Sequence, residues 1–196
     1  MLEAADSMTR MNNQLTVAVG SSSGAASAFN QLFDIAQNTK TPIEDLVLLF
    51  SRLAISSTEV GASQSEMMKV TTAVGQALRI SGVTATQAAG ALLQFSQAIG
   101  SGIVRAEEMN AMMDGGMIPL LVEVAKRVDG AQGSVAILRQ MIASGDVTST
   151  TFFDAVVKGA DALGAKVSSM ETTFSQSLTV AQNSLGKFVG VFDKAT

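Results

Sequence analysis

The side chains that most often carry enzyme chemistry are scarce in this chain. Its 196 residues include no Cys and no His. Without a thiol or an imidazole there is no Ser-His-Asp triad, no thiol nucleophile, no disulfide and no zinc site of the usual Cys and His type. The candidate chemical groups are therefore hydroxyls and carboxylates.

One serine lies in a pattern that is typical of hydrolase nucleophiles. Segment 20–24 reads Gly-Ser-Ser-Ser-Gly and matches G-x-S-x-G, with Ser22 at the nucleophile position. A nucleophile elbow needs a strand before it, a helix after it and a base within hydrogen-bond reach. Residues 15–19 do not form a convincing strand pattern, and no His is present. We therefore predict a loop in which Ser22 or Ser23 caps a helix that begins at Ala25.

Three carboxylates lie close together in the sequence, at Glu107, Glu108 and Asp114. Such groups can act as acid and base, or bind a hard cation, when the fold brings them to one site. Adjacent residues on a helix point about 100° apart, so Glu107 and Glu108 do not face each other. We predict solvated charges here and at Glu44 and Asp45, and we expect no catalytic, cofactor-binding or metal-binding residue in the chain.

The charged residues are few and mildly acidic overall. The net charge is −4, and charged residues make up 15% of the chain, below the roughly 25% of an ordinary soluble domain. Lys126 and Arg127 are adjacent, but the other basic residues are dispersed, whereas a nucleic-acid surface needs clustered cations. We expect no direct nucleic-acid binding, and we expect extensive buried surface or contacts with other chains.

One uncharged stretch, residues 80–104, is long enough to cross a bilayer. It contains several Gln and Ser residues and two separate Gly positions that favour turns, so we predict a buried helix with flanking turns rather than a membrane span. Residues 1–15 carry charges and amides where a signal peptide has an apolar core, so no signal peptide is expected.

Apolar residues recur mostly at helical spacing, and no strand pattern is found, so the sequence predicts an all-α fold. Helix starts are indicated by capping patterns at Thr41 with Pro42 and Glu44, Ser63 with Glu66, Thr84 with Gln87, Ser134 and Thr148. Short helices joined by short turns predict a bundle of antiparallel helices. We expect N-terminal helices in residues 1–40, a compact helical domain in residues 41–165, and in residues 166–196 the start of a long helix that continues in a parent protein.

The C-terminal segment carries an apolar row with heptad spacing, called the C-terminal row below. Its members follow one another in steps of four and three: Met170, Phe174, Leu178, Ala181, Leu185, Phe188 and Phe192. This pattern, sustained for about three heptads, predicts a long amphipathic helix with coiled-coil character. A row of that size is rarely left in water, so we expect the rest of the chain or another copy to cover it. We predict self-association through this helix.

Several segments in the middle of the chain have the composition and spacing of a known family. They are residues 49–53, 75–78, 94–99, 105–110, 117–121 and 138–145, with Gly102, Val147, Thr148 and the pair Phe152 and Phe153. Over residues 41–165 the chain resembles the tape measure domain of tailed-phage tape measure proteins.

The resemblance implies a structural protein of a phage or prophage tail, without catalytic residues or cofactors. It implies a long helical protein in the lumen of the tail tube, whose length sets tail length and which is present in the host cytoplasm during assembly. The implied partners are the tail tube protein, tail assembly chaperones and tail tip or baseplate proteins. Two alternatives stay open: a membrane-perturbing helical protein that aids genome delivery through transient membrane contact, and a tail-associated hydrolase that uses Glu107 or Glu108.

Overall fold

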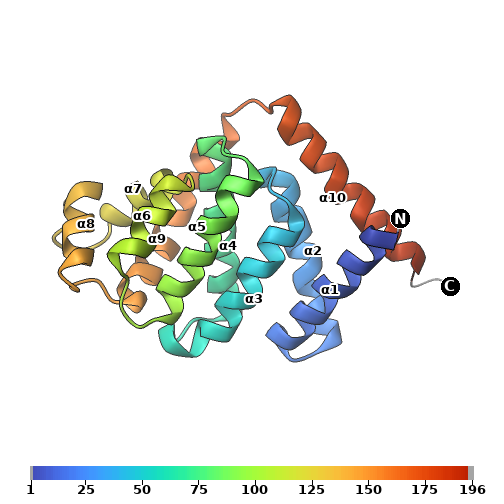
Figure 1. Cartoon of the computed structure of the whole chain (residues 1–196), viewed down its shortest axis with the longest axis horizontal. Coiled ribbons are helices and arrows are strands. Elements are labelled where there is room, and N and C mark those ends of the chain that lie inside the picture. Colours follow the sequence, from blue (N-terminus) through green and yellow to red (C-terminus); the bar gives the residue numbers. More distant parts are fainter. Residues whose placement is uncertain (1, 194–196) are drawn as a thin grey trace.

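The computed structural model describes residues 2–193, and in that range the chain forms ten α-helices, as the apolar spacing predicts (Figure 1). The first five are α1 (Leu2–Val19), α2 (Ser22–Thr39), α3 (Ile43–Val60), α4 (Gln64–Ser81) and α5 (Ala85–Gly100). The others are α6 (Ala106–Asp114), α7 (Ile118–Ala125), α8 (Val135–Ala143), α9 (Ser149–Ser168) and α10 (Phe174–Asp193).

Four helices begin where their capping residues predict. The caps are Ser63 for α4, Thr84 for α5, Ser134 for α8 and Thr148 for α9, and each side chain accepts a hydrogen bond from a backbone N–H three residues further on. Ser63 and Thr84 form complete capping boxes, because the side chain at the third helical position also accepts from the backbone N–H of the cap residue. These local predictions are confirmed.

Two other predicted caps are wrong. Helix α2 begins earlier than expected, because the Ser21 side chain accepts from the Gly24 N–H at 3.1 Å and Ser22 is already the first helical residue. At α3 the cap position is Pro42, which makes no side-chain cap hydrogen bond. The hydroxyl of Thr41 instead accepts from the hydroxyl of Thr39 at 3.1 Å.

The uncharged stretch 80–104 is divided between two helices. Helix α4 ends at Ser81, and Gly82 follows in the left-handed conformation with φ +65°, which favours glycine and lets the chain turn. Helix α5 then spans most of the stretch, which confirms the predicted helix with flanking turns. Over residues 2–193, each helix is too short or too polar to cross a membrane.

One continuous cluster of buried apolar side chains extends from α1 to α9. Its largest members that are almost completely buried include Phe50, Phe95, Phe152 and Phe153. The rings of Phe95 on α5 and Phe152 on α9 lie 6.1 Å apart in a tilted arrangement, which is favourable for aromatic pairs. Residues from the stretches 1–40 and 41–165 both belong to this cluster, so α1 and α2 are packed onto the rest of the bundle.

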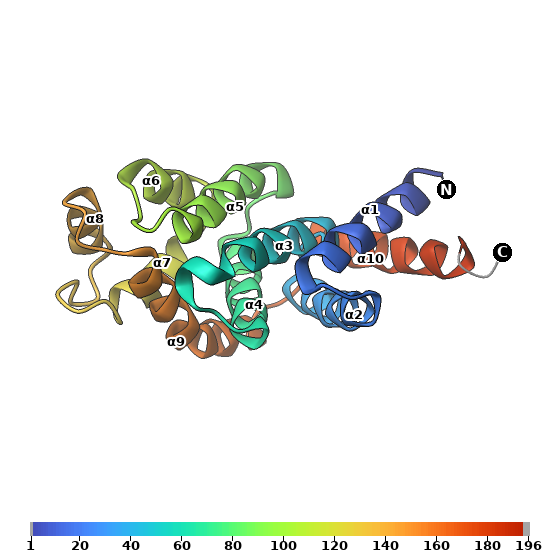
Figure 2. The same cartoon turned by 90° about the horizontal axis from the view of Figure 1, so that it is seen from below.

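Helix α10 crosses α1 and α2 on the outside of the bundle (Figures 1 and 2). It is separated from α9 by the linker 169–173, so the structure does not show one long helix beginning at residue 166. The helix starts at Phe174 because Thr173 and Gln176 form reciprocal hydrogen bonds of 3.1 and 3.3 Å between backbone N–H groups and side chains. Met170, the first member of the C-terminal row, therefore lies in the linker.

Candidate interaction surface

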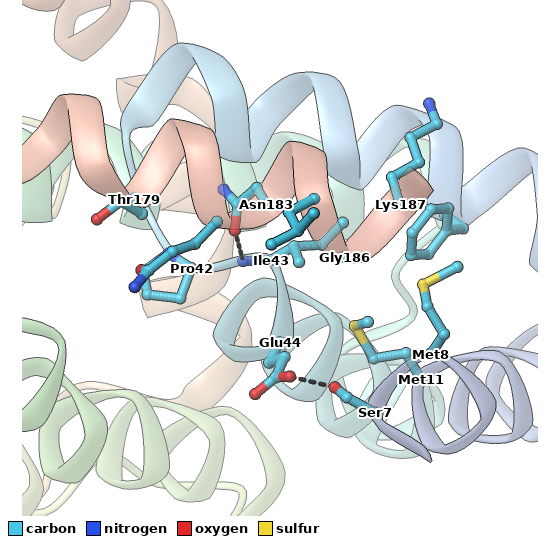
Figure 3. Close-up of a pocket in the computed structure, with 13 residues that line it drawn as sticks. Ser7, Met8, Met11, Pro42, Ile43, Glu44, Thr179, Asn183, Gly186 and Lys187 are labelled. Carbon is cyan, nitrogen blue, oxygen red and sulfur yellow. Dashed lines mark hydrogen bonds between the residues drawn. The ribbon is translucent and has the colours of Figure 1, made fainter. Parts of the chain in front are cut away.

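The side of α10 that faces the bundle is polar, and its central residue is Asn183. This side chain is buried, with 6% of its surface exposed. Its Oδ1 accepts from the Ile43 N–H at 3.0 Å (Figure 3). Its Nδ2 donates to the Thr41 carbonyl, also at 3.0 Å. Ile43 is the first residue of α3, so Asn183 caps α3 from another helix and takes the role that the sequence assigned to Thr41.

Two further contacts between α10 and the bundle are polar or cationic. Gln37 donates to the hydroxyl of Ser184 at 2.7 Å, and the Lys187 ammonium lies 4.0 Å from the centre of the Phe33 ring. None of the described side chains of α10 belongs to the apolar cluster that holds α1 to α9 together. Within the described part of α10, hydrogen bonds and a cation–π contact therefore join the helix to the bundle, and no described side chain of α10 extends the core.

The members of the C-terminal row on α10 whose side chains are described are largely exposed. Leu178, Leu185 and Phe188 are 52%, 63% and 61% exposed, and Ala181 is exposed too. Much of the surface of Leu178, Ala181 and Leu185 is thus accessible to a partner. Phe174 and Phe192 also lie in α10, but their side chains fall outside the described residues.

A pocket of about 320 Å³ lies between α10, α1 and the start of α3 (Figure 3). Met8, Met11 and Ile43 form apolar walls on the bundle side, while Asn183 and Lys187 of α10 line the opposite side. A polar helix face that lies over an apolar surface packs incompletely, which accounts for the remaining space. This pocket and the exposed part of the C-terminal row form one continuous surface, because Leu185 contributes to both.

The candidate carboxylates at α6 do not form a common site. Glu107 and Asp114 are exposed. Glu108 is buried, contrary to the prediction of a solvated charge, because its Oε2 accepts from the Arg105 N–H at 2.9 Å and so caps the first turn of α6. Among the residues that the structure describes, no group of three or more acidic side chains is arranged to hold a metal ion.

Of the pair at the start of α3, Glu44 is exposed as predicted for a solvated charge, whereas Asp45 departs from that prediction. Glu44 is exposed and accepts a hydrogen bond from the Ser7 hydroxyl of α1. Asp45 is partly buried, and burial, together with the neighbouring charge of Glu44, raises the pKa of Asp45 to about 6. The negative form of Asp45 is therefore disfavoured in the folded chain.

A buried ionic cluster that the sequence did not predict joins α7 to α9. Glu123 is 2% exposed and lies 3.0 Å from Lys126, 2.8 Å from Arg127 and 3.0 Å from Lys166. Desolvation by burial raises the pKa of Glu123, but hydrogen bonds from Lys166, Lys126 and Arg127 outweigh it and lower this pKa to about 2. Spacings of three and four residues indicate the contacts of Glu123 with Lys126 and Arg127, which directly follow α7, whereas no local pattern indicates Lys166.

Comparison with known protein families identifies the family of the chain. The sequence model of the family described as "Tape measure protein" matches residues 1–194, which includes the N-terminal helices and all of α10 as well as the resembling stretch 41–165. No curated protein and no solved structure matches the chain. The family is a structural one, and its members are components of phage tails. The chain belongs to the tape measure protein family.

Proposed function

We propose that this chain acts as a folded module of a tape measure protein that lies in the lumen of the tail tube and sets tail length. The observation that carries the proposal is the family match over residues 1–194. A helix advances 1.5 Å per residue, so the number of residues in an extended helical protein converts linearly into tube length. The tail tube protein, assembly chaperones and tail tip proteins are the partners that this role requires.

Purified tails or induced particles from the source should contain this chain in a few copies, far fewer than the tube protein. Quantitative mass spectrometry checks this, and the tryptic peptide of residues 80–105, which follows Arg79 and ends at Arg105, is a suitable reporter. The tube protein in the same particles calibrates the copy number. Complete absence of the peptide from tails would contradict the lumen placement.

We propose further that α10 pairs with α10 of a second copy through the exposed part of the C-terminal row. Leu178, Ala181 and Leu185 recur at spacings of three and four, as in a coiled-coil seam. The bundle leaves all three exposed, so a second helix can reach them without rearrangement of α10. Because Met170 lies in the linker, the paired region begins after Thr173.

Leu185→Lys should shift the chain toward the monomer at concentrations at which the unchanged chain associates. A charge at the centre of the row replaces apolar contact with an unpaired cation, which raises the dissociation constant by about tenfold or more. Sedimentation velocity over a concentration series measures this. Gln182→Lys adds the same charge at an exposed position outside the row and should leave association unchanged. A monomer at every concentration in the unchanged chain would refute the pairing.

A further inference from the structure

A second surface, on the other side of α3, has the features of a binding groove. Helices α3 and α5 lie side by side, with the start of α6 next to α5 (Figures 1 and 2). Between them is an open groove of about 530 Å³, called the α3–α5 groove below. The lining residues that matter for binding are Arg52, Ile55, Leu93, Gly100, Arg105 and Glu108.

The floor of the α3–α5 groove is set by a close approach of the two helices. A Cβ at Gly100 of α5 would lie 2.7 Å from the hydroxyl oxygen of Ser56 on α3, so only glycine permits this separation without a shift of that side chain. One turn earlier, Ser96 is buried and its hydroxyl donates to the Leu92 carbonyl at 2.6 Å. The Ser96 hydroxyl is thus already engaged within α5 and is not available to a partner.

The walls of the groove carry apolar side chains that are open to water. Ile55 on α3 is 72% exposed, and Leu93 on α5 is 38% exposed. An apolar strip of this kind between two helices suits the apolar side of a third helix.

The charged side chains that line the groove are two arginines and one glutamate, so the groove carries a net positive charge although the chain as a whole is acidic. Arg52 is partly buried, and within residues 2–193 no carboxylate lies within 4.0 Å of its guanidinium. The Arg105 side chain is 66% exposed, and its Nη1 lies 3.9 Å from Glu108. Glu108 is itself buried and accepts from the Arg105 N–H, and its charge offsets part of the Arg105 charge. The Arg52 guanidinium and the exposed part of Arg105 therefore leave the groove with a net positive charge, although the net charge of the chain is −4.

We propose that the α3–α5 groove binds an acidic amphipathic helix of another protein. The apolar side of that helix packs on Ile55 and Leu93, and its carboxylates pair with Arg52 and Arg105, whose planar guanidinium groups suit carboxylate oxygens. A second copy of this chain does not fit this description through α10, because Lys187 is the only charged residue in positions 174–192. The inference goes beyond the proposed function, since neither length setting nor α10 pairing uses this face.

Two synthetic helical peptides test the proposal. Both carry leucines at positions i, i+4 and i+7, one with glutamates and the other with lysines on either side of the leucines. Each is titrated into the 196-residue chain with labelled methyl groups, and chemical shifts are followed by NMR. The acidic peptide should shift the methyl signals of Ile55 and Leu93 saturably, and its affinity should fall as salt is added. The basic peptide should shift neither signal.

Variants of the two arginines separate charge pairing from apolar contact. Arg52→Gln and Arg105→Gln should each weaken binding of the acidic peptide by about threefold to tenfold. Lys158→Gln removes one positive charge at an exposed position that does not line the groove, and should leave the affinity unchanged. Equal binding of both peptides, binding of neither, or full affinity in the double arginine variant would overturn the proposal. Concentration-dependent shifts of the two methyl signals without peptide would assign the groove to a second copy instead.

Discussion

Glu123→Gln should lower the free energy of unfolding by about 2 to 3 kcal/mol at neutral pH. The substitution leaves Lys126, Arg127 and Lys166 around a buried site that no longer holds a negative charge. Removal of one partner from a fully buried ion pair costs about 3 to 5 kcal/mol, but the Lys126 and Lys166 side chains are 50% and 47% exposed and can hydrate. Urea denaturation followed by circular dichroism measures the loss, since the chain has no Trp or Tyr for fluorescence.

The same substitution should change the response of stability to acid. The pKa of Glu123 is about 2 in the folded chain against an ordinary value of 4.5, so the folded state binds fewer protons than the unfolded state between these values. The stabilisation from Glu123 is fully present above about pH 4.5 and is lost as the pH falls toward 2. The Gln variant should therefore lose less stability over this interval than the unchanged chain.

A control variant and a comparison of differences isolate the contribution of Glu123. Glu107→Gln removes an exposed carboxylate from α6 and should change the free energy of unfolding by less than about 0.5 kcal/mol. Asp45 acts in the opposite direction, because its raised pKa makes the folded state gain stability as the pH falls from about 6. That gain is common to the unchanged chain and the Glu123 variant, so it cancels in their difference. Identical acid profiles in the two proteins would show that the ionic cluster does not stabilise the fold.

Asn183→Ala should loosen α10 while the rest of the bundle stays intact. The variant loses both hydrogen bonds that join α10 to the start of α3, and the Ile43 N–H is left without its cap. The loss of a buried hydrogen-bonding side chain costs about 1 to 2 kcal/mol, which corresponds to about 5- to 30-fold faster local opening. Hydrogen–deuterium exchange should show this increase in the amides of α10 and little change in α4 or α9.

A neighbouring residue provides the matched control for Asn183. Ser184 also bonds to the bundle, through Gln37 at 2.7 Å, but this contact is exposed to water. Water replaces such a bond at little cost, so Ser184→Ala should accelerate exchange in α10 by less than about threefold. If the two variants exchange equally fast in α10, Asn183 is not the residue that holds this helix on the bundle.

The features that the sequence predicted well depend on residues a few positions apart. Ser63 with Glu66, and Thr84 with Gln87, are reciprocal caps whose partners lie within one helical turn, so three-residue spacing is enough to identify them. Thr173 and Gln176 have the same spacing and start α10 in the same way. The heptad pattern, which places Met170 on the helix, hid this start in the sequence.

The features that could not be predicted depend on contacts between distant parts of the chain. Asn183 replaces Thr41 as the cap of α3 although 140 residues separate it from Ile43, and Lys166 reaches Glu123 from 43 residues away. A heptad pattern shows which residues share one side of a helix, but it does not show which side meets the bundle. The polar contacts of Asn183 decide that orientation, and so they leave Leu178 and Leu185 exposed.

The arrangement of α1 and α10 affects how chain length would convert into tail length under the function proposed above. The first turn of α1 and the last turn of α10 lie at the same end of the molecule (Figure 2). As one straight helix, 196 residues would have a contour length of about 290 Å, whereas the folded chain returns to the end from which it started. The module therefore adds little to the end-to-end distance of a protein that contains it. In a series of length variants, tail length should rise by about 1.5 Å for each helical residue added outside the module. A plot of tail length against the total number of residues in the protein should therefore extrapolate to zero tail length at a positive residue number, because the residues of the module add little length.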